Sequence, residues 1–248
     1  MKVVGLISGG KDSCYNMMCC VKNGHEIVCL ANLFPSECTE IDSYMYQSVG
    51  SEGIIAIAQA MSLPLFRKEI RGRPLNIEMD YAYVPNDEVE DLYCLLKTVK
   101  QHHPDVEGVS VGAINSTYQK KRVEHVCARL QLQPLCYLWE RDQLELFDNM
   151  IQDGIDAFII KVAAAGLTSK NLGMTLKEVR ENLLEIHKKY GAHMCGEGGE
   201  YETFVVDCPL YHKRISIDQC EAILHSENDI APVNYLRLNQ LSLTEKIE

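Results

Sequence analysis

The chain has 248 residues, of which 46% are hydrophobic and 24% charged, and its formal net charge at pH 7 is −11. These values are typical of a globular protein with a sizeable core, built as one large domain or two modest ones. The negative charge argues against a protein that binds the nucleic-acid backbone, because such proteins need clustered Lys and Arg. We therefore expect no direct nucleic-acid partner.

Eleven cysteines are scattered along the chain in odd number and without a C-x-x-C pair, which argues against a disulfide framework and favours a reducing compartment. Lys11 and Asp12 interrupt the first apolar stretch, so no signal peptide is expected. The longest apolar stretch, 157–167, contains Lys161 and is too short to span a bilayer. We expect a cytoplasmic protein with no membrane partner.

The N-terminal segment predicts a strand, a glycine-rich loop and a helix. Residues 3–7 form an apolar run typical of a buried parallel strand, and the sequence SGGKDS follows at 8–13. A helix is expected over about 11–22, before an Asn-Gly stop signal. Backbone N–H groups at its start, two serine hydroxyls and the Lys11 ammonium would converge on an anion, which indicates a phosphate site.

A Walker A loop is one alternative for this segment. Gly5, Gly10 and Lys11 satisfy its spacing, but Asp12 stands where that motif needs Ser or Thr for magnesium. A solvated glycine-rich turn is the other alternative, which the strand–loop–helix context disfavours. The sequence at 8–13 instead resembles the pyrophosphate-binding loop (PP-loop) of the N-type ATP pyrophosphatases, which cleave ATP to AMP and pyrophosphate.

Alternating strand and helix patterns continue to about residue 133. Strands are expected at 26–33, 63–70 and 106–111, and helices at 42–61 (capped by Asp42, with an interruption at 50–53), 85–100 and 116–130. This alternation predicts an α/β fold with a doubly wound, mostly parallel, Rossmann-like sheet. The resemblance implies the adenine nucleotide alpha hydrolase type of that fold.

Ligands of such sheets lie beyond the carboxyl ends of the strands, at the point where the strand order reverses. Residues 8–13 and 112–115 are therefore expected to face one crevice. The connection over 71–83 is longer than most and is a candidate binding segment.

The sequence pattern changes from Pro134 onward. An apolar strand is expected at 155–164 and helices at 141–152 and 175–190, the latter with Thr175 as cap and Gly191 as stop. Short alternating runs follow at 203–207, 213–217, 222–225 and 234–243. We predict a PP-loop domain over 1–133 and a smaller α+β second domain with antiparallel strands over 134–248.

A second unusual stretch, HMCGEGGEYET at 193–203, is named the acidic loop below. Glu197, Glu200 and Glu202 lie within six residues around a Gly-Gly pair, with Tyr201 among them. Such crowding of like charges is tolerated when a metal or a cationic ligand neutralises them. The alternative is an acidic surface turn, which the dense glycines disfavour.

Three motifs, SGGKDS at 8–13, VGAI at 111–114 and GEGGEYET at 196–203, together resemble the diphthine–ammonia ligase (diphthamide synthetase) family, over nearly the whole chain. In that family ATP activates the carboxylate of diphthine, a modified histidine of translation elongation factor 2, as an acyl-adenylate. Ammonia then displaces AMP and leaves an amide. The resemblance implies ATP and Mg2+ as cofactors, and elongation factor 2 and ammonium as partners.

The resemblance also implies site residues, which fall into three overlapping sets. The nucleotide-binding set is Ser8, Gly9, Gly10, Lys11, Asp12, Ser13 and Gly112. The substrate-binding set is Glu197, Gly198, Gly199, Glu200, Tyr201, Glu202 and Thr203. The catalytic set is Lys11, Asp12, Glu197, Glu200 and Glu202.

Lys11 would offset the charge that develops on leaving pyrophosphate. Asp12 would either cap the helix or hold Mg2+, and the sequence does not distinguish these roles. The acidic loop could bind the trimethylammonium group of diphthine with the face of Tyr201, or take a proton from ammonium before it attacks. The three glutamates are expected to share these tasks.

Two other functions fit parts of the sequence. One keeps adenylation but transfers to a tRNA or a small molecule, and the negative charge counts against tRNA. The other is a non-catalytic ATP-sensing module, which would not need the acidic loop. Several further basic and aromatic side chains could serve the site or lie on the surface: Arg71, Arg73, Tyr118, Lys120, Lys121, Arg122 and Lys161.

Overall fold

The computed structural model describes residues 1–35, 45–47, 49–226 and 231–246. The first half contains β1 (Lys2–Leu6), α1 (Lys11–Lys22), β2 (Glu26–Phe34), α2 (Ile54–Met61), β3 (Leu65–Glu69), α3 (Glu88–His102), β4 (Val106–Ser110), α4 (Thr117–Leu130) and β5 (Gln133–Leu135). The second half contains α5 (Gln143–Gln152), β6 (Asp156–Val162), α6 (Leu176–Tyr190), β7 (Tyr201–Asp207), β8 (Lys213–Ser226) and β9 (Val233–Glu245). Single 3-10 turns occur at Ser51–Gly53 and Ser169–Asn171.

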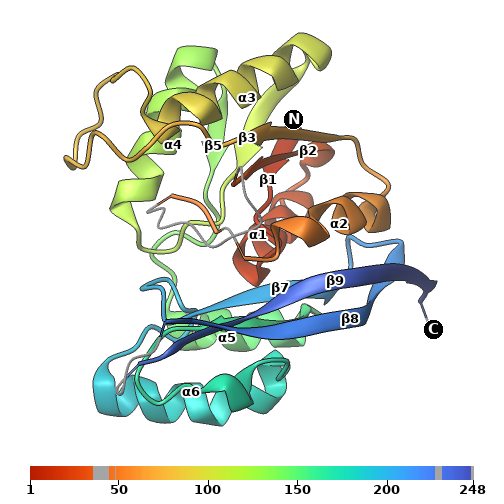
Figure 1. Ribbon diagram of the computed structural model, residues 1–248. Coiled ribbons are helices and arrows are strands. Elements are labelled where there is room, and N and C mark those ends of the chain that lie inside the picture. The colour runs from red at the N-terminus through yellow and green to blue at the C-terminus, as the bar shows by residue number, and fades with distance from the viewer. Residues whose placement is uncertain (36–44, 48, 227–230, 247–248) are drawn as a thin grey trace.

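The first sheet has five parallel strands in the order β3-β2-β1-β4-β5. Helices α3 and α4 cover one face, and α1 and α2 cover the other (Figure 1). The strand order reverses between β1 and β4, so the predicted doubly wound α/β fold is confirmed. The carboxyl ends of β1, β2 and β4 meet at this switch point, where such sheets bind ligands.

The second sheet has four strands in the order β7-β6-β9-β8, and every pairing in it is antiparallel. Helices α5 and α6 lie on its outer face, whereas α1 and α2 lie against the face that looks toward the first sheet (Figure 1). The two sheets therefore share one helical layer. A single apolar cluster runs from α1 and α2 through the second sheet to α5 and α6, and a second cluster fills the space between the first sheet and α3 and α4.

Of the helix expected over 42–61, the interruption at 50–53 and the part after it are confirmed, but residues 45–47 are not helical. The structure has a 3-10 turn at Ser51–Gly53 and α2 only from Ile54 to Met61, while the expected cap, Asp42, lies outside the described residues. Gly50 has a φ of 84°, which no α-helix accepts. A Cβ on Gly53 would lie 2.4 Å from the Phe204 ring, so contact with the second sheet sets the start of α2.

Three further expectations need correction. Pro85 precedes α3 instead of lying in its first turn, because Asn86 has a φ of 64° and Asp87 caps the helix by accepting from the Val89 N–H. The runs expected at 213–217 and 222–225 form one strand, β8, whose register shifts at Gln219. Residues near Pro134 form β5, a strand of the first sheet that the sequence pattern missed because it is only three residues long.

The C-terminal helix of the second half agrees with its prediction. Thr175 caps α6 in a capping box with Glu178, and Gly191 ends the helix with a φ of 72°. No helix in the described ranges has the length and apolar character needed to cross a membrane.

Candidate active site

The PP-loop joins β1 to α1 at the switch point of the first sheet. Gly9 has a φ of 92°, a conformation that favours glycine. Gly10 is the N-cap of α1, and no side chain caps the helix there. A Cβ on Gly10 would lie 2.8 Å from the Gln47 amide oxygen. Glycine at both positions lets the loop turn sharply under the start of the helix, as predicted.

The two serines of the PP-loop hydrogen bond within the loop. The Ser8 hydroxyl accepts from the Gly10 N–H at 3.3 Å and lies 3.4 Å from the Ser13 hydroxyl. The Ser13 hydroxyl donates to the Gly10 carbonyl at 2.9 Å. Both residues line the cavity described below. The serines therefore hold the loop curved and still present their hydroxyls to a ligand.

Lys11 is only 2% exposed, and the acidic loop encloses its ammonium group. Nζ donates to the Cys195 carbonyl at 2.5 Å and to Asp12 Oδ2 at 3.0 Å, and it lies 5.0 Å from the centre of the Tyr201 ring. An ammonium has three N–H donors, and these contacts use two of them. The third N–H of Lys11 remains for a ligand, because the Lys11 side chain lines the cavity.

Asp12 lies beside Lys11 in a desolvated position. Burial raises the pKa of this carboxyl above its ordinary value, and the Lys11 cation opposes that rise. Oδ1 is buried without a hydrogen-bond partner among the described residues. A buried carboxylate oxygen that lacks a partner is costly, so its chemistry suits a bound cation.

The PP-loop is bonded directly to β7 of the second sheet. The Lys11 N–H donates to the Thr203 hydroxyl at 3.0 Å, and the Val205 N–H donates to the Gly9 carbonyl at 2.9 Å. Gln47 donates to the Thr203 carbonyl at 3.2 Å. Lys11 and Thr203 are about 190 residues apart in the sequence, so two distant segments of the chain form one site.

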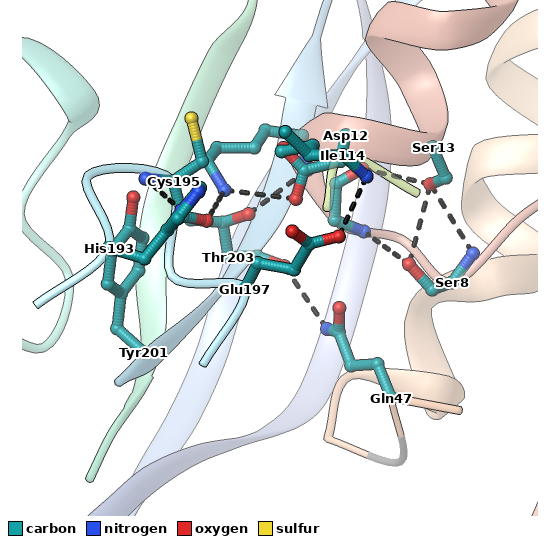
Figure 2. Close-up of polar contacts among 12 residues, drawn as sticks. Ser8, Asp12, Ser13, Gln47, Ile114, His193, Cys195, Glu197, Tyr201 and Thr203 are labelled. Atoms are coloured by element: carbon teal, nitrogen blue, oxygen red, sulfur yellow. Dashed lines mark hydrogen bonds and ion pairs between the residues drawn. The ribbon is translucent and has the colours of Figure 1, made fainter. Parts of the chain in front are cut away.

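Glu197 connects the acidic loop to the segment that follows β4. Its carboxylate accepts from the backbone N–H groups of Ile114 at 2.7 Å, Asn115 at 2.6 Å and Ser116 at 3.2 Å, and Figure 2 shows it directed at Ile114 beside Asp12. The same segment packs closely on the PP-loop, since a Cβ on Gly112 would lie 2.9 Å from backbone atoms of Asp12 and Ser13. The predicted meeting of 8–13 with 112–115 is confirmed.

The other two glutamates of the acidic loop have different surroundings. Glu202 lines the cavity and forms an ion pair with Lys161 of β6 at 3.0 Å. Glu200 accepts from the His193 backbone N–H at 2.6 Å and is not among the residues that line the cavity. Glu200 thus braces the acidic loop, whereas Glu197 and Glu202 face the space where a ligand would bind.

The aromatic ring of Tyr201 is buried. Its hydroxyl donates to the Met194 carbonyl at 2.6 Å, and the Lys11 ammonium lies over the ring. Burial raises the pKa of the phenol well above its ordinary value, so it remains a hydrogen-bond donor. The contact that was expected for a trimethylammonium group is made by Lys11 in this structure.

His193 supports the acidic loop without lining the cavity, and the sequence did not single it out. Its Nδ1 accepts from the Cys195 N–H at 3.1 Å, and its Nε2 lies 3.3 Å from the Asn115 amide. Burial lowers the pKa of this imidazole, so it is neutral near pH 7. The only sequence signal was its position in the acidic loop, because a lone histidine without ligand spacing indicates nothing by itself.

The PP-loop, Glu197, Tyr201 and Glu202 border a cavity of about 420 Å³ at the carboxyl ends of β1, β2 and β4. Ser8, Lys11, Asp12 and Ser13 form one wall and Gly196–Gly199 and Tyr201–Thr203 another. The remaining wall is mainly apolar and includes Leu6, Leu33, Met45, Leu92, Leu95, Val111 and Val123. A polar end that suits phosphates and an apolar end that suits a flat base are features of a nucleotide site.

Comparisons with known proteins agree with this geometry. A family model described as the diphthamide synthase N-terminal domain matches residues 1–134, and one described as the diphthamide synthase C-terminal domain matches residues 142–237. The mouse protein named diphthine–ammonia ligase is 58% identical over the whole of this chain and 94% of its own length. The chain belongs to the diphthamide synthase family.

Other relatives carry the same name. The human protein is 56% identical, again over the whole of this chain and 94% of its own length. The relative from Schizosaccharomyces pombe is 54% identical over 93% of this chain, which corresponds to 38% of that longer protein. Similarity at this level extends through the PP-loop and the acidic loop together.

In this diphthamide synthase family member, several basic residues that the sequence offered as possible site residues interact with other parts of the protein. Lys120 lies over the Trp139 ring, and Lys121 pairs with Asp80. Arg71 pairs with Glu69 and is exposed. None of these cations is among the described residues that line the cavity, whose cationic side chain is that of Lys11.

Proposed function

We propose that this diphthamide synthase family member is an ATP-dependent diphthine–ammonia ligase that acts on translation elongation factor 2. The observation that carries the proposal is the joining of the PP-loop to the acidic loop around one cavity through Lys11, Thr203 and Glu197. Adenylation and amide formation need a phosphate site next to an acceptor site, and this arrangement supplies both walls. The names of the relatives supply the reaction.

The proposed reaction has two balanced steps. A carboxylate oxygen of diphthine attacks the α-phosphorus of ATP, the bond to the bridging oxygen breaks, and pyrophosphate leaves. Ammonia then attacks the carbonyl carbon of the acyl-adenylate, AMP leaves with the carbon–oxygen bonding pair, and one proton is lost. Adenylation is required because a free carboxylate is a poor electrophile.

The residues of the PP-loop fit the first step. Lys11 has an N–H donor not used by Cys195 or Asp12, and the Ser8 and Ser13 hydroxyls line the same wall, so these groups would hold leaving pyrophosphate. Charge that develops during the step is stabilised by donors fixed in advance. The apolar wall at Leu33 and Val111 would hold the adenine.

Magnesium fits the carboxylate of Asp12. Oδ1 of Asp12 is buried without a partner, and no described group of three or more potential ligands forms a metal centre. Mg2+ commonly takes one or two protein carboxylates and completes its shell with water and phosphates. We propose that Asp12 holds Mg2+ with the nucleotide, where the ion would offset phosphate charge.

The acidic loop fits the second step. Glu202 lies in the cavity wall, and its ion pair with Lys161 fixes the position of its carboxylate. This carboxylate can attract both the quaternary ammonium of diphthine and free ammonium. A cytoplasmic location suits the ten described cysteines, which are all free thiols.

Product analysis tests the proposal. The chain is incubated with ATP, ammonium and diphthine-bearing elongation factor 2, and AMP, ADP and the mass of the factor are followed. We expect release of AMP and conversion of the carboxylate to an amide, and each should depend on both ammonium and the diphthine-bearing factor. Release of ADP would contradict adenylation, and AMP without a change in the factor would assign the enzyme to another acceptor, such as a tRNA or a small molecule.

A further inference from the structure

The connection between β3 and α3 exposes an unusual set of apolar side chains. Nine large apolar side chains are clearly exposed in the described part of the chain, and four of them lie within residues 75–83, named the apolar loop here. Leu75 is 53% exposed, Ile77 65%, Met79 54% and Tyr83 60%. Scattered apolar residues on a surface need no explanation, but a group of this size on one loop does.

Hydrogen bonds fix the backbone of the apolar loop at its N-terminal end. Asp87 Oδ2 accepts from the N–H groups of Leu75 at 3.0 Å and Asn76 at 2.9 Å, while its Oδ1 caps α3. Asn76 also donates to the Ala82 carbonyl at 3.1 Å, which links both ends of the loop. The exposed side chains are therefore held outward by a built conformation.

Arg122 of α4 anchors the loop from beneath. The residue is fully buried, and its guanidinium donates to the carbonyls of Asn76 at 2.5 Å and Glu78 at 2.9 Å. It also contacts the ring of Tyr81, the one aromatic residue of the loop that is buried. Burying an arginine on backbone carbonyls is costly. A buried arginine at this position is understandable if the apolar loop has to keep one conformation.

The apolar loop lies next to the wall of the cavity. Tyr118 and Arg122 contact each other on the side of α4 that faces the apolar loop. The positions that follow each of them, Gln119 and Val123, line the cavity. In Figure 1 the loop projects beside α4, as the orange-gold segment at the edge of the molecule. A macromolecule whose side chain enters the cavity can therefore cover this loop.

The size of the apolar loop favours a transient partner. Four half-exposed side chains present on the order of several hundred Å², which is typical of functional patches. A stable dimer needs roughly 800 Å² from each partner, so a second copy of the chain does not fit this surface well. Exposed Glu78 stands among the apolar side chains and would favour a basic residue on the partner, whereas Asp80 already pairs with Lys121.

We propose that the apolar loop is the docking surface for the protein that bears the diphthine side chain. This inference rests on the proposed function, in which the substrate is a protein. The modified histidine would enter the cavity while an apolar patch with a flanking basic residue on the same protein covers Leu75, Ile77, Met79 and Tyr83. The loop would thus set recognition of the protein and leave the chemistry unchanged.

The test is the triple variant L75S/I77S/M79S, with the double variant I55S/L224S as matched control. Ile55 is 50% and Leu224 51% exposed, and both lie outside the apolar loop. KM and kcat for amidation of diphthine-bearing elongation factor 2 are measured, together with the Kd of that protein without ATP. We expect KM and Kd to rise at least tenfold in the triple variant, with kcat and the unfolding midpoint retained, and no change in the control.

Other outcomes separate the two proposals. Unchanged KM and Kd in the triple variant would overturn docking at this loop while leaving the ligase in place. If the wild-type chain forms no amide, the proposed function fails, and the Kd comparison still decides whether the loop binds the protein. If the wild-type chain self-associates in sedimentation and the triple variant does not, the loop is a contact between copies and the docking proposal is wrong.

Discussion

The Lys11 ammonium is held by groups from both halves of the chain. Asp12 comes from its own loop, whereas Cys195 and Tyr201 come from the acidic loop. A lysine so enclosed loses little side-chain entropy when it binds phosphate, because the chain has already ordered it. The PP-loop is therefore pre-organised by the second sheet.

Replacing Lys11 tests this assignment. K11A should lower the rate of ATP–pyrophosphate exchange about 100-fold or more, the usual size for removal of a donor to developing charge. The matched control is K22A, because Lys22 ends the same helix but is exposed and pairs with Asp153. Equal loss of exchange in both variants would contradict a specific role for Lys11.

Lys161 was left open by the sequence and pairs with Glu202 in the structure. Both side chains are mostly buried, so removing either should destabilise the fold by about 1–3 kcal/mol, because the other charge loses this partner. K161M/E202Q should cost less than the sum of K161M and E202Q. Denaturant unfolding of the wild type, the two single variants and the double variant gives the coupling free energy of the pair. Strict additivity would mean that the two residues are not energetically linked.

His193 gives a pH dependence of stability with a defined sign. Burial lowers its pKa, so between that lowered value and the ordinary histidine pKa of about 6.5 the unfolded chain binds more protons than the folded one. Stability therefore falls as pH decreases through this window. H193Q should flatten the slope below pH 6.5 in thermal unfolding, and a slope as steep as that of the wild type would contradict this assignment.

At the scale of elements, helix α6 was predicted closely, whereas the helix expected over 42–61 was predicted correctly only from its interruption at 50–53 onward. The limits of α6 come from local groups, namely Thr175 with Glu178 at one end and Gly191 at the other. The start of α2 depends instead on the contact of Gly53 with Phe204, which lies about 150 residues away along the chain. A sequence pattern contains the first kind of signal. For α2 its glycines indicated the break at 50–53, but not the contact with Phe204.

The capping box of α6 allows a prediction far from the cavity. T175A removes a side chain that accepts from the Glu178 N–H and bonds its carboxylate, so the free energy of unfolding should fall by about 1 kcal/mol. Helix α6 lies on the outer face of the second sheet, and ATP–pyrophosphate exchange should be retained (Figure 1). Loss of exchange in T175A at temperatures where it is folded would show that α6 influences the cavity.

For the molecule as a whole, the two sheets are built around shared helices, α1 and α2, and the cavity lies where the PP-loop meets β7. The sequence singled out both loops as parts of a site, and the roles given to their residues stay predictions. It did not predict that Glu200 would bond to the His193 backbone, or that Glu197 would bind the backbone N–H groups at 114–116. Those partners are set by the packing of distant segments, which spacing in a sequence does not encode.

In the proposed mechanism this arrangement joins a carboxylate to AMP before ammonia attacks. The most direct test uses elongation factor 2 whose diphthine carboxylate carries oxygen-18, turned over with ATP and ammonium. We expect one labelled oxygen to appear in AMP and the other to remain in the amide, with no label in pyrophosphate. Label in inorganic phosphate together with ADP would show an acyl-phosphate route and contradict the role given to the PP-loop.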